Sequence, residues 1–351
     1  MKDIIGGKQP PQAPQVKMVQ VDEDSAGQRL DNFLIRQLKG VPKTHVYRII
    51  RSGEVRVNKG RASADTRVEL GDQVRLPPVR VSERVAEKSE AMAAVMARGA
   101  PAREFTVLFE DEHVLAIDKP AGVAVHGGSG VSFGVIEQLR MARPQARFLE
   151  LVHRLDRETS GILLIAKKRS ALKHLQDQFR ERETGKTYLA LVKGAWPASK
   201  KVLDKPLHKY LLADGERRVK VVAKDDPDGM RSVTLVKISP DSPVKTPPGG
   251  EAAAAGRLDP GFSLLEVTIK TGRTHQIRVH LASEGYPIAG DDKYGDFELN
   301  KALQKQGLKR MFLHAWRLQF NHPATGERIA LLASLPSELH EFLVHVAKPK
   351  S

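Results

Sequence analysis

Four apolar runs of strand length, spread over the C-terminal two thirds of the chain, most constrain its fold. They are GILLIAK, TYLALVKG, SVTLVKI and FSLLEVTIK. The preceding FTVLFEDEHVLAIDKP predicts two more strands around an acidic turn. Helical spacing of apolar residues appears in RSALKHLQDQFRER and in the final SELHEFLVHVAK. Residues 105 to 348 are therefore predicted to form an α+β domain with a mixed, largely antiparallel sheet.

A smaller module is predicted before this domain, over residues 19 to 80. Apolar residues at helical spacing indicate a first helix after a capping-box pattern of Ser25 and Gln28, and a second helix over residues 42 to 52. EVRVN and RVELGDQVRLP follow, and the alternation around the Gly-Asp pair predicts a small hairpin or meander. The front of the chain is thus predicted to be a small αα-β module.

Three segments lack periodic apolar residues. Residues 1 to 18 are rich in Pro and Gln, which predicts a disordered leader. Residues 81 to 104 are rich in Ala and charge, which predicts a linker. Residues 241 to 261 are rich in Pro, Gly and Ala, and predict a flexible insertion within the larger domain. A chain of 351 residues is also long for one core, so two domains are expected.

The charge of the chain indicates its class of partner. It contains 57 Lys and Arg against 42 Asp and Glu, and the formal net charge of +15 favours a polyanion. Between positions 29 and 61, nine basic residues stand against two acidic ones. A solvated basic face is the alternative, but such a concentration in one small module favours phosphate binding. The residues we expect to contact phosphates of the polyanion there are Arg29, Lys43, Arg48, Arg51, Arg56 and Lys59.

Several classes of function are disfavoured. The chain has no cysteine, which excludes disulfides, thiolate metal sites and thiol nucleophiles. MKDIIGGKQPPQAPQVK lacks the apolar core of a signal peptide, and no run of about 18 apolar residues could cross a bilayer. His275 and His280, five residues apart, have a spacing that suits no shared metal. We expect a cytoplasmic protein that has no membrane partner, no metal and no cofactor.

Two glycine-rich patterns leave other chemistries open. HGGSG at 126 to 130 could cradle phosphate, but no G-x-G-x-x-G occurs there. GVSFG matches a serine-hydrolase elbow around Ser132, yet it abuts HGG, whereas the corresponding hydrolase motifs lie on separate strand ends. A plain glycine-rich turn is the preferred interpretation of both.

The segment HRLDRETSG contains the main candidate for chemistry. It places Asp156 between Arg154 and Arg157, just before a turn and the apolar strand GILLIA. An ion-paired surface turn is one interpretation. The other is a carboxylate that nearby cations keep ionised, which without a metal suggests nucleophilic or proton-abstracting work, as in glycosyl chemistry. A second basic cluster, Arg273 and Arg278, occurs in TGRTHQIRVH.

The chain resembles pseudouridine synthases of the RluA/RluC/RluD group, most closely the RluC type that modifies 23S ribosomal RNA. DKPAGVAVHGG, HRLD-x-x-TSG, KTYLALV and TGRTHQIRVH occur in the order found in that group. The front module resembles the alpha-L RNA-binding module of small-subunit ribosomal protein S-four, through QRLDNFL and GEVRVNKG. The resemblance implies the pseudouridine synthase fold and isomerisation of uridine in 23S rRNA or a large-subunit assembly intermediate. We expect the chain to act as a monomer.

The resemblance also implies roles for individual residues. Asp156 would attack the ribose or assist elimination there, and the sequence leaves both routes open. Arg278 would pair with its carboxylate. Tyr188 would stack on the uracil or relay a proton. Arg154 would fill the stack that the flipped uridine vacates, and Arg273 would contact RNA.

The neighbours of these residues have expected roles of a structural kind. Arg157 and Glu158 occupy positions that the family motif leaves open, so we expect a solvated ion pair there. Lys119 and Pro120 are expected to shape the cleft. Two other functions stay open: a non-catalytic rRNA-binding or ribosome-assembly protein, and an RNA glycosylase that releases free uracil.

Overall fold

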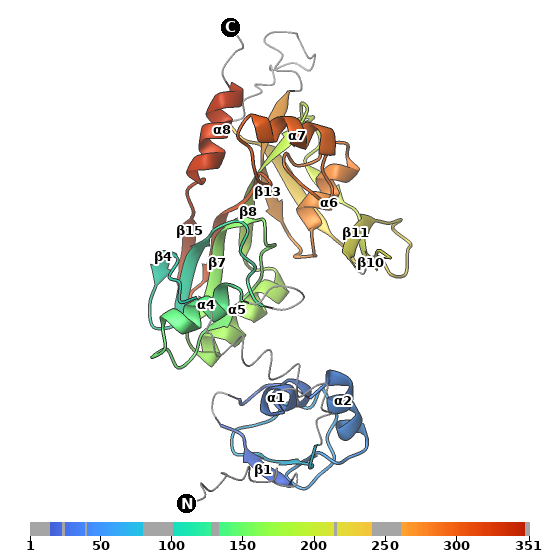
Figure 1. Ribbon diagram of the computed structural model, residues 1–351, viewed down its shortest axis with the longest axis vertical. Helices are drawn as coiled ribbons and strands as arrows, with labels where there is room; N and C mark the ends of the chain where they lie inside the picture. Colours follow the sequence, from blue (N-terminus) through green and yellow to red (C-terminus); the bar gives the residue numbers. More distant parts are fainter. Residues whose placement is uncertain are drawn as a thin grey trace, which may run out of the picture. The chain divides into compact units, whose positions relative to one another are not determined.

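The computed structural model of the chain describes residues 15–22, 25–38, 41–79, 101–127, 133–213, 216–240 and 261–347. The chain forms two compact units, Met1–Gly99 and Ala100–Ser351 (Figure 1). Most of the predicted leader and linker, residues 241 to 260 of the predicted insertion, and residues 128 to 132, which include Ser132, lie outside the described residues.

The front unit contains the two predicted helices and a small antiparallel sheet. The helices are α1 (Leu30–Gln37) and α2 (Lys43–Arg51), and the strands β1 (Lys17–Gln20), β2 (Arg56–Val57) and β3 (Gln73–Leu76) lie in the order β1-β3-β2. Phe33, Ile49 and Val74 are among the fully buried apolar residues that join helices to sheet. Because these apolar side chains are buried in the core, the charged residues of this unit lie on its exposed faces.

Two local predictions for this unit are wrong. Helix α1 begins at Leu30 with Arg29 as its N-cap, whereas Ser25 and Gln28 form a separate turn upstream, with Gln28 N–H donating to the Ser25 carbonyl at 3.2 Å. Strand β3 pairs with β1 and β2 rather than with the segment around Val68. Within the described residues, the first strand of the unit is β1, which begins at Lys17 and pairs along the full length of β3.

The second unit is built on a ten-stranded sheet, in the order β4-β5-β7-β14-β8-β13-β12-β9, with β15 on β14 and β6 on β7. The pair β7–β14 is parallel and the other pairs of this sheet are antiparallel, as predicted. The strands are β4 (Thr106–Glu110), β5 (Val114–Lys119), β6 (Glu150–Leu151), β7 (Ser160–Ala166), β8 (Gly185–Lys193), β9 (Val202–Asp204), β12 (Val233–Ile238), β13 (Phe262–Ile269), β14 (Leu313–Asn321) and β15 (Arg328–Leu332).

Helices cover both faces of the β5–β7 part of this sheet. Helix α4 (Val135–Ala142) packs on one set of alternating residues, including Leu163, and α5 (Arg169–Glu181) packs on the other, including Leu164. Because successive side chains of a strand point to opposite faces, both sets are apolar. This explains the unbroken apolar run GILLIA, every residue of which is buried.

Helices α6 (Gln276–Ser283), α7 (Phe297–Lys305) and α8 (Ser337–Ala347) contribute to a separate core with β8 and β13. A two-stranded hairpin, β10 (Leu207–Leu211) and β11 (Arg217–Val221), lies beside α6, as Figure 1 shows. Leu207 and Val219 of the hairpin pack against Val279 of α6. In the described part of the chain, no helix is both long enough and apolar enough to span a bilayer.

Candidate active site

Asp156 lies in the irregular segment between β6 and β7. The Thr159 N–H donates to the Asp156 carbonyl at 3.1 Å, which closes the turn that the sequence predicted. Arg157 pairs with Glu158 at 2.8 Å on the exposed side of this turn, as expected. The turn therefore separates the Asp156 carboxylate from a surface ion pair.

Gly161 explains the glycine of the TSG pattern. Its φ is +110°, and a Cβ at this position would lie 2.3 Å from the carbonyl oxygen of Ala315. Any side chain would clash with β14 at the point where β7 pairs with it in parallel. Gly161 thus allows the strand behind Asp156 to join the middle of the sheet.

Lys119 is fully buried behind the turn that carries Asp156. Its Nζ donates to the carbonyls of Pro120 at 2.8 Å, Val123 at 2.8 Å and Arg157 at 3.1 Å. Burial lowers its pKa to about 7, and the Arg310 charge acts in the same direction. Lys119 therefore ties the segment after β5 to the residue that follows Asp156, a structural role compatible with the expectation that it shapes the cleft.

Arg278 of α6 lies against the same turn and lines the same cavities as Asp156. Its Nη1 lies 3.4 Å from Oδ2 of Asp156, and its Nε and Nη2 donate to the two carboxylate oxygens of Asp291 at 2.8 and 2.7 Å. The paired fork with Asp291 fixes the guanidinium plane. Within the described residues, neither Arg154 nor Arg157 makes a hydrogen bond or ion pair with Asp156, and Arg278 is the arginine that contacts its carboxylate.

Burial and neighbouring charges set the protonation states of Arg278 and Asp291. Burial opposes the charge on Arg278, but the hydrogen bonds to Asp291 and the charges of Asp291 and Asp156 raise its pKa above the ordinary value. Burial likewise opposes ionisation of Asp291, but Arg278 holds the pKa of that carboxyl below its usual range. The Arg278–Asp291 pair is therefore a permanently charged support for Asp156.

Tyr188 of β8 also lines the cavity that contains Asp156. Burial, and then the charge of Asp156, raise the pKa of the Tyr188 hydroxyl, so it stays protonated at neutral pH. Two adjoining cavities of about 110 and 340 Å³ meet at the site. Both are lined by Arg154, Asp156, His275 and Arg278, and Tyr188 and Arg273 line the smaller one. The structure thus brings the predicted catalytic residues together.

The predicted RNA-binding residues lie at the surface of both units. Arg154 is exposed and Arg273 is partly exposed at the cavity. In the front unit, Lys43, Arg48, Arg51 and Lys59 are exposed and Arg56 is partly exposed. Arg29 is exposed but also pairs with buried Asp31 at 2.8 Å. Part of its charge therefore supports the fold of the module.

His275, Asp291 and Tyr294 are site residues that sequence reasoning did not assign to it. Nε2 of His275 lies 3.9 Å from Oδ2 of Asp156, and its Nδ1 lies 2.8 Å from the Tyr294 hydroxyl. Asp291 and Tyr294 belong to GDDKYG at 290 to 295, which follows the predicted basic cluster in the chain. The sequence showed an aspartate near the second arginine cluster. The spacing gave no indication that this aspartate would lie close to Asp156.

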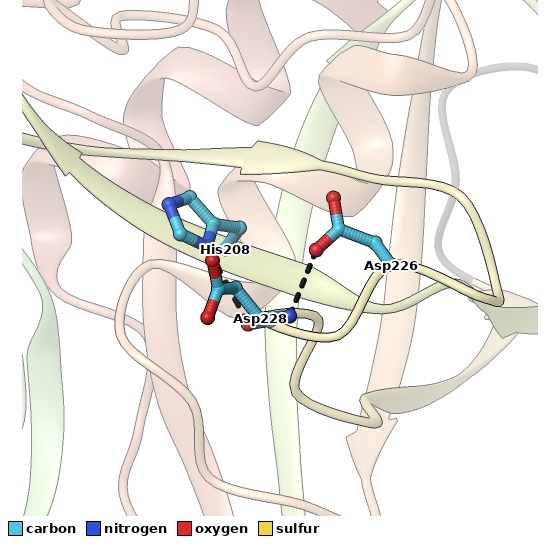
Figure 2. Close-up of side chains that lie close together, drawn as sticks. All are labelled: His208, Asp226 and Asp228. Carbon is cyan, nitrogen blue, oxygen red and sulfur yellow. Dashed lines mark hydrogen bonds between the residues drawn. The ribbon is translucent and has the colours of Figure 1, made fainter.

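A separate cluster on the hairpin has residue types that can bind metals. Figure 2 shows His208, Asp226 and Asp228, whose candidate ligand atoms lie within 4.8 Å of one another. The Asp228 N–H donates to Asp226 Oδ1 at 2.9 Å, and the carbonyl of Asp228 lies 3.4 Å from His208 Nδ1. These are the contacts of an aspartate-stabilised turn, and we assign no ligand to it.

Comparison with known proteins identifies the family. The family model described as RNA pseudouridylate synthase matches residues 113–283, and the S4 domain model matches residues 28–74. The chain is 48% identical over 344 residues to "Ribosomal large subunit pseudouridine synthase C" of Pasteurella multocida, covering 96% of this chain and 95% of the relative. The chain belongs to the RNA pseudouridylate synthase family. The fold and the S4 module expected for this family are both present.

Other members of the family give the same result. The protein of the same name from Escherichia coli K12 is 48% identical over 334 residues, which cover 95% of this chain and 97% of the relative. Among solved structures, "Human RNA Pseudouridylate Synthase Domain Containing 4" has a TM-score of 0.52 and 26% identity, covering 75% of this chain and 97% of that one. The similarity to the bacterial family members therefore extends over both units.

Proposed function

We propose that the chain isomerises uridine to pseudouridine in large-subunit ribosomal RNA, with Asp156 acting at the ribose. The observation that carries this proposal is the convergence of Asp156, Arg278 and Tyr188 on one cavity. The names of the bacterial relatives, which match nearly the whole chain, support the choice of large-subunit RNA.

The reaction breaks the bond from the anomeric carbon to N1 of uracil and forms a bond from the same carbon to C5. The C5 hydrogen leaves as a proton and N1 regains one, so nothing is oxidised. Asp156 either adds to the anomeric carbon or removes a ribose proton to assist elimination. Arg278 holds its carboxylate in place. The Tyr188 ring stacks on the flipped uracil or its hydroxyl relays a proton.

The target base must leave its stack to reach the cavity. Arg154, exposed at the cavity rim, fills the space that the base vacates. Arg273 and the exposed basic residues of the front unit bind phosphates of the RNA. We further propose that the substrate is 23S rRNA or a large-subunit assembly intermediate in the cytoplasm, and that the chain acts as a monomer.

Tritium release from C5-labelled uridine in 23S rRNA fragments tests the reaction in single turnover. Tritium release together with pseudouridine in the digested RNA is the expected result. Free uracil without pseudouridine would instead identify an RNA glycosylase, and binding without either product would identify a non-catalytic rRNA-binding protein. Mapping pseudouridines in rRNA from cells that lack the chain would identify the sites.

A further inference from the structure

Asp156 meets two nitrogen groups on the same carboxylate oxygen. Arg278 Nη1 lies 3.4 Å from Oδ2, and Nε2 of His275 lies 3.9 Å from the same atom. Within the described ranges of the chain, no hydrogen bond or ion pair falls on Oδ1. Oδ1 is therefore the oxygen available to a bound ribose.

Tyr294 contacts both of these nitrogen groups. Its hydroxyl lies 2.8 Å from Nδ1 of His275, and its ring centroid lies 5.2 Å from the guanidinium carbon of Arg278. The hydroxyl oxygen also accepts the backbone N–H of Val219, on strand β11, at 3.0 Å. Tyr294 is thus held by the hairpin on one side and faces the partners of Asp156 on the other.

The hydrogen bonds of Tyr294 select one tautomer of His275. The hydroxyl has one hydrogen, and Nδ1 of His275 is the acceptor available to it among the described residues. If the hydroxyl donates to Nδ1, the neutral imidazole must carry its own hydrogen on Nε2. That N–H then faces Oδ2 of Asp156.

Two further observations support this arrangement. Burial lowers the pKa of His275. The charge of Asp156 raises this pKa and the charge of Arg278 lowers it, and the net decrease favours the neutral ring. Burial raises the pKa of Tyr294, which keeps its hydroxyl a donor. In addition, His275 is a non-glycine residue with a φ of +52°, held at the N-terminal end of α6. Such backbone strain occurs where the position of a side chain matters.

We propose that Tyr294 is a positioning residue that fixes the tautomer of His275, so that His275 and Arg278 together hold Oδ2 and present Oδ1 of Asp156 to the ribose. This inference rests on the proposed function of the site. Catalytic hydrogen bonds are often long before substrate binds, and the 3.9 Å between Nε2 and Oδ2 is compatible with such a bond.

The tautomer can be measured directly. In ¹⁵N-labelled protein, we expect the His275 resonance to show a protonated Nε2 and an unprotonated Nδ1, with its assignment established by loss in His275→Gln. Tyr294→Phe keeps the ring over Arg278 but removes the hydroxyl, and should give a mixture of tautomers. A protonated Nδ1 in the unmutated neutral ring would overturn the proposal.

Kinetics provide the second test. Tyr294→Phe should lower the single-turnover rate constant by about tenfold while RNA affinity changes less than twofold. The matched control is Tyr286→Phe, because the Tyr286 ring packs on Trp196 outside the site. This variant should keep the full rate. His275→Gln keeps an N–H donor of similar reach, whereas His275→Met has the same length without one. We expect the Gln variant to turn over several-fold faster than the Met variant.

The outcomes separate this inference from the proposed function. If the unmutated chain releases no tritium, the proposed function fails and the inference fails with it. If it is active but Tyr294→Phe stays within twofold of its rate, or the Gln and Met variants are equal, only the inference is overturned. If Tyr294→Phe folds poorly, the inference is still tested by the His275 tautomer in the unmutated protein and by the rates of His275→Gln and His275→Met.

Discussion

Arg278 and Asp156 are 122 positions apart in the chain, yet Nη1 of the arginine lies 3.4 Å from Oδ2 of the carboxylate. Arg278 is almost fully buried, and Asp291 occupies the other edge of its guanidinium. Asp156 is thus held by a guanidinium whose position is fixed by burial and by its two hydrogen bonds to Asp291. The proposed chemistry requires this rigidity, because the carboxylate must meet the ribose in one orientation.

Asp156→Asn should abolish most of the conversion and leave RNA binding intact. The substitution keeps nearly the same shape but removes the charge that acts at the ribose. We expect the single-turnover rate constant to fall by at least roughly 10⁴-fold, which corresponds to about 5 kcal/mol in the barrier. Tritium release and RNA binding would be measured in parallel. Glu158→Gln is the control, since Glu158 pairs with Arg157 on the surface, and a loss within tenfold for Asp156→Asn would refute the assignment.

Arg278→Ala should affect both stability and rate. It leaves the buried carboxylate of Asp291 without its paired donor, so the free energy of unfolding should fall by about 3 to 5 kcal/mol. Turnover should also slow sharply, because Asp156 loses the same partner. Urea unfolding and single-turnover rates would be compared with Arg273→Ala, which removes a partly exposed arginine of the same cluster. Equal stability of the two variants would contradict the supporting role of the Arg278–Asp291 pair.

The need to protonate buried His314 should lower the free energy of unfolding in acid. Its Nδ1 lies 2.8 Å from the Ser160 hydroxyl, and burial lowers its pKa from 6.5 to about 4. Between these two values the unfolded chain takes up a proton that the folded chain does not. Stability is therefore full above pH 6.5 and is lost as the pH falls towards 4, by about 3 kcal/mol. Unfolding free energies measured across this range should show a shallower slope in His314→Gln.

The matched control for this measurement is His340→Gln, in an exposed residue of α8. That variant should reproduce the pH slope of the unmutated chain. If His314→Gln did so as well, another buried group would have to account for any loss of stability in acid.

The front unit should supply affinity and not chemistry. Lys43, Arg48 and Arg51 are exposed on α2, and removing one basic side chain that binds a phosphate should reduce the salt slope of binding by about 0.7 to 0.9. Replacing all three with alanine should therefore weaken rRNA binding and flatten its salt dependence, while saturating single-turnover rates are retained. Lys301→Ala on α7, where Lys301 pairs with Glu298 on the surface, is the control.

Deletion of residues 1 to 80 extends the same test to the whole front unit. Turnover should survive in the truncated chain at high enzyme concentration. Complete loss of single-turnover activity in a truncated chain that is still folded would show that the front unit contributes to the chemistry itself.

The sequence alone predicted the strands β4, β5, β7, β8, β12 and β13 and the helices α1, α2, α5 and α8, because each has its own local apolar periodicity. It did not predict strand β14 or helices α4, α6 and α7. GILLIA was predicted to be an apolar strand, and the arginine and aspartate motifs were interpreted through their resemblance to a family. The wrong predictions for the front unit concern Ser25 and Val68. There the conformation is decided by backbone hydrogen bonds between segments distant in the chain, from the Gly27 N–H to the Val68 carbonyl and from the Val68 N–H to the Gln28 carbonyl.

The tertiary structure alone decided which charges meet. Asp156 has two arginines within two positions in the chain, but the groups that lie against its carboxylate are the Arg278 guanidinium and the His275 ring, brought to it by the packing of α6 against the sheet. The roles of Asp291 and Tyr294 likewise depend on side chains that meet in the folded chain. Sequence spacing cannot reveal such contacts, because electrostatic interaction depends on distance in space and on burial, and both are set only when the sheet has formed.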